Sequence, residues 1–261
     1  MLADFFSADT FHERYGKQKA KVITSFSMFY DLEDPCEFAR QVRSCLEPSG
    51  IWVLEQSYMP EMLRQNSFDT VCHEHLSYYG MRQIKYIMDK VGFNIIDFEF
   101  NDVNGGSISV VVSPSGKECT TKLSGLLALE IEEGLDTCEP WEEFASRMTD
   151  NNHKFVKIVR DLRDEGYKVA GLGASTKGNV TLQTWGITPN DILAIGDVNP
   201  DKDGSFAPGT WIPIKNEDEV LAYYDAFVIL PWHFKKFFVN NPKFKGKKLI
   251  FPLPTPEIVV P

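Results

Sequence analysis

Hydrophobic residues over the first third of the chain change between the spacing of a buried strand and that of an amphipathic helix. The pattern predicts a strand over residues 21–29, a helix over 34–50 that Pro48 and Gly50 end, and a second strand over 51–55. A strand, a helix and a strand in this order form a right-handed parallel crossover, which is typical of an open α/β sheet. We therefore expect a parallel sheet in this part of the chain.

The pattern that follows predicts a helix over residues 81–92 and two strands over 93–100 and 107–114. Gly105 and Gly106 lie between these two strands and can adopt the positive φ angles of a tight turn. The two strands should therefore pair with each other and form an antiparallel edge of the sheet.

Residues 121–166 carry apolar side chains at helical spacing and predict one long helix. A second series of strands and helices follows, and the last ten residues, with four prolines, should be irregular. The fold class is therefore α/β, with a sheet-forming part over residues 1–118, a helical connector over 119–165 and a Rossmann-like lobe over 166–261.

Composition excludes several classes of function. Of 261 residues, 27 are Lys or Arg and 37 are Asp or Glu, and the net charge of −10 disfavours binding to nucleic acid or an anionic membrane. The five cysteines form no C-x-x-C motif, so we expect neither a disulfide framework nor a metal site. No apolar run is long enough to span a membrane, and no secretory leader is visible, which favours a cytoplasmic protein.

The densest polar cluster is His73-Glu74-His75, in a loop that also carries Tyr78 and Tyr79. Histidine or a buried glutamate can act as a general base, and loops at the carboxyl ends of parallel strands are where α/β sheets bind ligands. A hydrogen-bonded loop without chemistry is an equally good interpretation of these residues alone.

A glycine-rich turn, GLGASTKGN, spans residues 171–179 between a predicted strand and helix. Its backbone N–H groups, the Ser175 hydroxyl and Lys177 favour an anion such as a phosphate, although the spacing departs from G-x-G-x-x-G. Asp197 follows the next strand, where it either accepts from ribose hydroxyls or forms an Asx turn. Both interpretations stay open.

Several runs resemble one family in order along the chain. Residues 23–55 resemble the later strands of a class I S-adenosylmethionine-dependent methyltransferase. The runs FDTVCHEHLSYYG, NGGSISVVV, VAGLGASTKGN, DVNPDKDGSFAPGTWIPI and VILPW resemble the sugar C-methyltransferases, which act on nucleotide-linked keto-deoxysugars. The resemblance implies a partial class I methyltransferase sheet followed by a second Rossmann-like lobe.

The resemblance also implies roles for individual residues. The family methylates the carbon next to a ketone, so His75 is expected to be the base and Glu74 to orient it or share the proton. The expected substrate contacts are Tyr78, Tyr79, Asn104 and Ser107 for the sugar, Ser175, Lys177 and Asn179 for the nucleotide diphosphate, and Asp197. Contacts to the cofactor, S-adenosyl-L-methionine, are expected from Ser25, Phe26 and Met28.

The sequence departs from the family's pattern at three points. It shows neither the family's cysteine-rich zinc motif nor the first strands with the main turn that holds S-adenosylmethionine, and Cys72 stands where many relatives have tyrosine. We expect a separate chain or an oligomer to cover the resulting sheet edge. The alternative functions are a non-catalytic nucleotide-sugar-binding module and, less favoured because of the glycine spacing, an NAD(P)-dependent oxidoreductase.

Overall fold

The computed structural model describes residues 4–261, and these form two compact units. Unit 1 contains the residues up to Met62 together with His73–Pro140, and unit 2 contains Leu63–Cys72 together with Trp141–Pro261. The segment Leu63–Cys72 therefore packs with residues that are distant in sequence. The domain boundaries expected at residues 118 and 165 stay a prediction.

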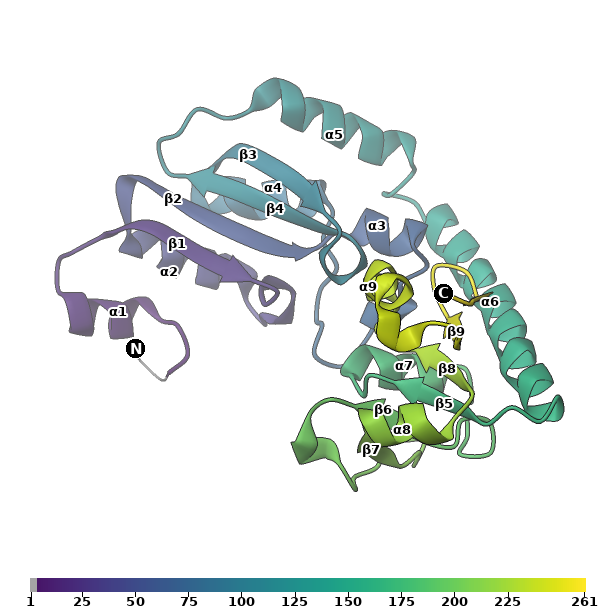
Figure 1. The fold of residues 1–261 in the computed structure, drawn as a ribbon. Coiled ribbons are helices and arrows are strands. Elements are labelled where there is room, and N and C mark those ends of the chain that lie inside the picture. The colour runs from purple at the N-terminus through teal and green to yellow at the C-terminus, as the bar shows by residue number, and fades with distance from the viewer. Residues whose placement is uncertain (1–3) are drawn as a thin grey trace. The chain divides into compact units, whose positions relative to one another are not determined.

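Unit 1 is built on a four-stranded mixed sheet with the order β1-β2-β4-β3 (Figure 1). Strand β1 pairs in parallel with β2, whereas β4 pairs antiparallel with both β2 and β3. The parallel crossover and the antiparallel edge expected from the sequence are both confirmed. The elements are α1 (Ala8–Tyr15), β1 (Ala20–Phe26), α2 (Pro35–Cys45), β2 (Leu46–Ser57), α3 (Met59–Arg64), which runs into unit 2, α4 (Met81–Val91), β3 (Asn94–Asn101), β4 (Ser107–Ser113) and α5 (Thr120–Glu132).

The core of unit 1 lies between this sheet and helices α2 and α4. Asp34 caps α2 by accepting from the Glu37 amide, and Pro35 begins the helix with a fixed φ. Trp52 of β2 is fully buried and packs against Phe29 and Phe93. The contact with Phe29 holds the segment that follows β1, where the candidate site begins, against the middle of β2.

Strand β1 is more exposed than its sequence predicts. Its pattern was expected to give a buried strand, yet Val22 and Phe26 are each 55% exposed. The reason is its position, because β1 is an edge strand of the sheet and β2 is its neighbour on one side.

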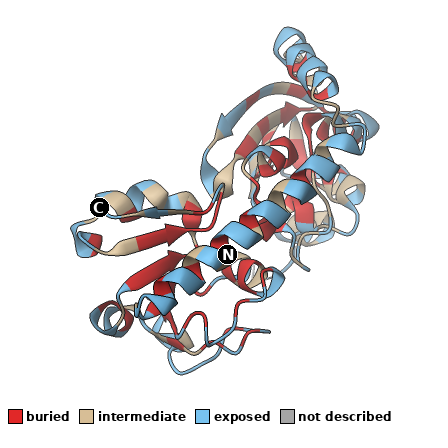
Figure 2. Ribbon diagram, turned by 90° about the vertical axis from the view of Figure 1, so that its right-hand side faces the viewer, coloured by how far each residue is buried: buried red, intermediate tan, exposed pale blue. Residues whose placement is uncertain are grey.

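Unit 2 contains a six-stranded mixed sheet with the order β10-β9-β8-β5-β6-β7. All its neighbouring strands are parallel except β10, which is antiparallel to β9. Buried residues are concentrated on the strands of this sheet (Figure 2). The elements are α6 (Glu139–Asp164), β5 (Val169–Leu172), α7 (Thr176–Thr184), β6 (Ile195–Asp197), β7 (Ile214–Asn216), α8 (Glu217–Tyr223), β8 (Ala226–Ile229), α9 (Lys235–Asn240), β9 (Lys248–Phe251) and β10 (Glu257–Val259).

Two features of the fold correct the expectations from sequence. The single helix expected over residues 121–166 is two helices, α5 and α6, and Gly134 lies in the break with a φ of +68°. The proline-rich tail is not wholly irregular, because Glu257–Val259 forms β10 at the edge of the sheet. Proline has no backbone N–H to donate, and it is tolerated beside an edge strand because such a strand pairs on one side only.

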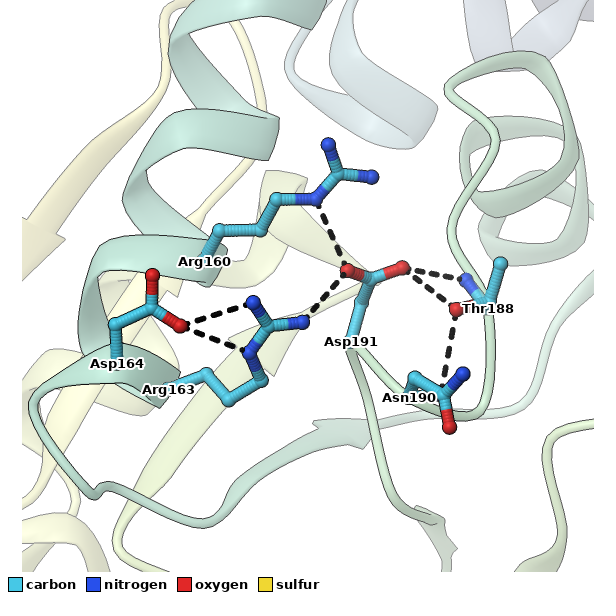
Figure 3. Close-up of polar contacts among 6 residues, drawn as sticks. All are labelled: Arg160, Arg163, Asp164, Thr188, Asn190 and Asp191. Atoms are coloured by element: carbon cyan, nitrogen blue, oxygen red, sulfur yellow. Dashed lines mark hydrogen bonds and ion pairs between the residues drawn. The ribbon is translucent and has the colours of Figure 1, made fainter.

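A buried aspartate holds α6 against the rest of unit 2 (Figure 3). Asp191 is 4% exposed and accepts from the Thr188 amide and hydroxyl at 3.0 and 2.7 Å. Arg160 and Arg163 reach it from α6 at 3.1 and 3.7 Å. Burial raises the pKa of Asp191, but the Thr188 and Arg160 contacts outweigh it and lower the pKa overall.

Candidate active site

The loop with the His-Glu-His cluster is fixed to the turn that follows β1. The amides of Leu76 and Ser77 both donate to the Tyr30 carbonyl, at 2.9 and 3.1 Å. The ring of Tyr30 lies 4.2 Å from the His75 ring, centroid to centroid. His75 is therefore held at the carboxyl end of a parallel strand, which is where α/β sheets place reactive groups.

Two carboxylates lie near His75. Asp31 ends the 3-10 turn η1 (Phe29–Asp31), and burial raises its pKa, while His75 opposes the rise and Glu74 adds to it. His73 is exposed and its Nε2 lies 3.9 Å from a Glu74 carboxylate oxygen. Asp31, which the sequence analysis missed, is therefore close enough to interact electrostatically with both His75 and Glu74, and the roles expected of His75 and Glu74 stay predictions.

Two non-glycine residues with left-handed backbone meet at this end of the sheet. Ser27 follows β1 with a φ of +52°, and Asn104 lies in the β3–β4 turn with a φ of +55°. The Asn104 amide reaches the Ser27 hydroxyl at 3.5 Å, at the limit of a hydrogen bond. Non-glycine residues in this conformation are strained and are concentrated at functional sites.

The other expected sugar contacts differ in their surroundings. Tyr78 is partly exposed, whereas Tyr79 is buried with its ring 5.5 Å from that of Phe29. Burial raises the pKa of the Tyr79 hydroxyl. Ser107 is also buried, and its hydroxyl donates to the Val103 carbonyl at 2.9 Å, which fixes the turn that carries Asn104.

The residues expected on the cofactor side lie along the end of β1 and just beyond it. The Ser25 hydroxyl accepts from Trp52 Nε1 at 2.9 Å and so faces the core. Phe26 is half-exposed, and Met28 is partly exposed. Phe26 therefore offers apolar surface at this strand end, whereas Met28 packs partly against the core, and their role as cofactor contacts stays a prediction.

In unit 2 the glycine-rich turn joins β5 to α7. Gly173 has a φ of +85°, and a Cβ there would lie 2.7 Å from Pro231, so a larger residue does not fit. Ser175 caps α7 by accepting from the Gly178 amide at 3.2 Å. Lys177 and Asn179 lie in the first turn of the helix and are both partly exposed. The amides of Gly173, Ala174 and Gly178 are engaged within the protein, and the role of the turn in binding an anion stays a prediction.

Asp197 is fully engaged by its own unit. One carboxylate oxygen accepts from the Ala174 amide at 2.7 Å and from Lys202 at 3.2 Å, and the other accepts from the Asn199 amide at 2.8 Å. The bond to the amide two residues ahead is the Asx-turn geometry. Asp197 thereby fixes the end of the glycine-rich turn.

Sequence reasoning also missed a cluster of side chains in unit 2. Asp69, Trp232 and His233 gather around Lys177. One signal was present, because Trp232 and His233 lie in the loop after β8, the sheet neighbour of β5, with Leu230 and Pro231 between. Asp69 carried no such signal.

Neither a metal site nor a membrane span is found in the part of the chain that the structure describes. No three His, Cys, Asp or Glu side chains within residues 4–261 are grouped so that they could hold a metal ion. None of the helices in that range is both long and apolar enough to cross a membrane.

Comparison with known protein families decides which family the chain belongs to. Residues 102–254, more than half of the chain, match the family described as C-methyltransferase C-terminal domain. The chain belongs to this C-methyltransferase family. Residues 3–97 match a second family, described as methyltransferase domain. The first match includes Asn104 and the glycine-rich turn, and the second includes His75 and Glu74.

Individual relatives of this chain are distant. C-methyltransferase NovU from Streptomyces niveus is 29% identical over 246 residues, which cover 92% of this chain and 59% of NovU. The chain thus spans well under two thirds of that relative's length. Among solved structures, LepI in complex with SAM is 16% identical, with a TM-score of 0.32 over 37% of this chain and 26% of LepI. The CcbJ methyltransferase from Streptomyces caelestis is 12% identical, with a TM-score of 0.29 over 38% of this chain and 58% of CcbJ.

Proposed function

We propose that this chain carries out S-adenosylmethionine-dependent methyl transfer to the carbon next to a ketone in a nucleotide-linked deoxysugar. Membership of the C-methyltransferase family supports the reaction class. The observation that carries the proposal is His75, fixed by the Tyr30 contacts and flanked by Asp31 and Glu74. A histidine with neighbouring carboxylates is suited to remove a weakly acidic proton.

The chemistry assigned to this chain is proton removal and charge stabilisation. His75 takes the proton from the carbon next to the ketone, and Asp31 and Glu74 stabilise the imidazolium that forms. Tyr78 and Asn104 are the proposed donors to the enolate oxygen, which needs positioned hydrogen bonds, while Ser107 holds the turn of Asn104 in place. S-adenosylmethionine, when bound, supplies the electrophilic methyl group.

Recognition of the nucleotide part is assigned to unit 2. Ser175, Lys177 and Asn179 at the start of α7 are the proposed diphosphate contacts, because a helix N-terminus and an ammonium group both favour an anion.

Substitution of His75 tests the proposal. The His75→Gln variant should lose methyl transfer from labelled S-adenosylmethionine by roughly a hundredfold or more, the usual contribution of a general base. Its affinity for a thymidine diphosphate sugar, measured by calorimetry, should stay unchanged. The exposed neighbour His73, replaced by Gln in the same way, is the matched control and should keep its turnover. Undiminished turnover in the His75→Gln variant would refute the role of His75 as base.

A further inference from the structure

A fully buried carboxylate lies in unit 2, on the segment that precedes the His73–His75 loop. Asp69 belongs to the 3-10 turn η2 (Phe68–Thr70) and is 0% exposed. Its Oδ2 accepts from Trp232 Nε1 at 2.8 Å, whereas its Oδ1 is buried and has no hydrogen-bond donor among the residues that the structure describes. An ionised carboxylate buried in this way is costly unless a positive charge faces it.

Lys177 supplies that charge. It is the second residue of α7, and η2 packs directly against this helix. Burial raises the pKa of Asp69, and Lys177 opposes the rise, as does the Trp232 hydrogen bond. Burial lowers the pKa of Lys177, and Asp69 in turn opposes that change. Each group therefore favours the charged form of the other.

Two further titratable groups face Lys177. Cys72 lies at the end of the same segment as Asp69. Like Asp69 it raises the pKa of Lys177, but its effect is smaller. His233 lies in the 3-10 turn η5 (Trp232–Phe234), where burial and then Lys177 lower its pKa to about 4. The His233 ring is therefore neutral near pH 7 and adds no competing positive charge. Asp69 is the carboxylate whose charge acts on Lys177 and opposes the effect of burial on its pKa.

We propose that Asp69 is a positioning residue for phosphate recognition, which fixes the Lys177 side chain at the first turn of α7 and keeps its ammonium group charged. The inference rests on the proposed function, in which Lys177 contacts the substrate diphosphate. Asp69 acts through Lys177 and does not touch the substrate. Trp232 takes part indirectly, because its indole N–H holds the carboxylate in place.

The proposal predicts a specific pH dependence. Removal of the Asp69 carboxylate takes away the attraction that raises the pKa of Lys177, so the ammonium group loses its proton at a lower pH. An opposite charge at close range changes a pKa by about 1–3 units. The Asp69→Asn variant should therefore bind a diphosphate well at low pH. As the pH rises, its affinity should fall at a pH about one unit or more lower than in the unchanged chain.

The experiment measures the charge of Lys177 and diphosphate binding separately on the full chain. The first readout is the NMR titration of lysine Cε carbons, with the Lys177 signal assigned from Lys177→Met. The second is calorimetric titration with thymidine diphosphate across the same pH range. The matched control is Asp201→Asn, which removes an exposed aspartate from the loop after β6. Thermal unfolding shows that each variant folds, and Trp232→Phe replaces Asp69→Asn if the latter does not.

The outcomes separate the inference from the proposed function. A lower Lys177 midpoint in Asp69→Asn, with the matching shift in the binding profile and no shift in Asp201→Asn, supports the inference. An unchanged midpoint overturns it. If Lys177→Met binds thymidine diphosphate as tightly as the unchanged chain, the phosphate role in the proposed function fails. A midpoint shift without any binding effect would then leave Asp69 as a structural partner of Lys177, and the positioning role would be refuted.

Discussion

Replacement of Glu130 should destabilise unit 1 more than any exposed substitution on the same helix. Glu130 lies on α5 and is 4% exposed. One carboxylate oxygen accepts from the Tyr58 hydroxyl and the Met81 amide, both at 2.6 Å, and the other accepts from the Arg82 amide at 3.0 Å. Two of these donors are the first amides of α4, so a side chain from one helix caps the start of another.

The size of the effect follows from the hydrogen bonds that are lost. In Glu130→Ala the buried Met81 amide loses its acceptor and the Tyr58 hydroxyl loses its bond to Glu130, at a cost of about 1–3 kcal/mol each. The Arg82 amide is only partly buried and regains water at little cost. We therefore expect a loss of about 3–5 kcal/mol in the free energy of unfolding. Glu130→Gln keeps one acceptor oxygen and should lose about 1–2 kcal/mol.

Urea unfolding followed by circular dichroism measures this effect. Glu132→Ala, an exposed glutamate on the same helix, is the matched control and should change stability by less than about 0.5 kcal/mol. Tyr58→Phe removes one of the three donors, and combined with Glu130→Ala it should cost less than the sum of the two single changes. A Glu130→Ala variant as stable as the Glu132→Ala control would refute the capping role.

Two further predictions concern pH. The pKa of Asp191 is lowered in the folded state. Its contribution to stability is therefore fully present above about pH 3.8, the ordinary pKa of an aspartate, and is lost as the pH falls through the lower pKa of the folded state. Asp191→Asn should therefore cost about 1–2 kcal/mol at neutral pH, and urea unfolding that shows the same deficit below the folded pKa would contradict this explanation. Asp31→Asn removes a carboxylate that faces His75, so the imidazole pKa should fall and the acidic limb of the pH–rate profile should move to lower pH. An unmoved limb in steady-state methyl transfer would show that Asp31 does not act on His75.

Local signals in the sequence were enough to predict the arrangement of most strands. The parallel crossover follows from the periodicity of residues 21–55, and the antiparallel edge follows from the Gly105–Gly106 turn. The Asx turn of Asp197 was one of two open interpretations, and the bond from the Asn199 amide confirms this turn, while a ribose contact of Asp197 stays a prediction. In each of these cases neighbouring residues carry the information.

Features that depend on distant contacts could not be predicted in this way. Asp69 looks like an ordinary loop aspartate until the segment Leu63–Cys72 is seen to pack in unit 2 against α7 and Trp232. The exposure of β1 depends on its place at the sheet edge, and β10 depends on pairing with β9. Asn151 is a polar residue in the apolar stripe of α6, and it is buried because its side-chain amide donates to the Pro254 carbonyl at 2.9 Å.

The most direct test of the account is solvent deuterium exchange at the carbon next to the ketone. A thymidine diphosphate-linked keto-deoxysugar is incubated with the chain in D₂O without a methyl donor, and proton NMR follows the signal of that carbon. Proton removal needs only the base and the donors to the enolate oxygen. We therefore predict exchange of the proton on this carbon for deuterium, and we expect His75→Gln to slow it by about a hundredfold or more. Exchange at the same rate in His75→Gln, or none with a chain that binds the sugar, would contradict the account.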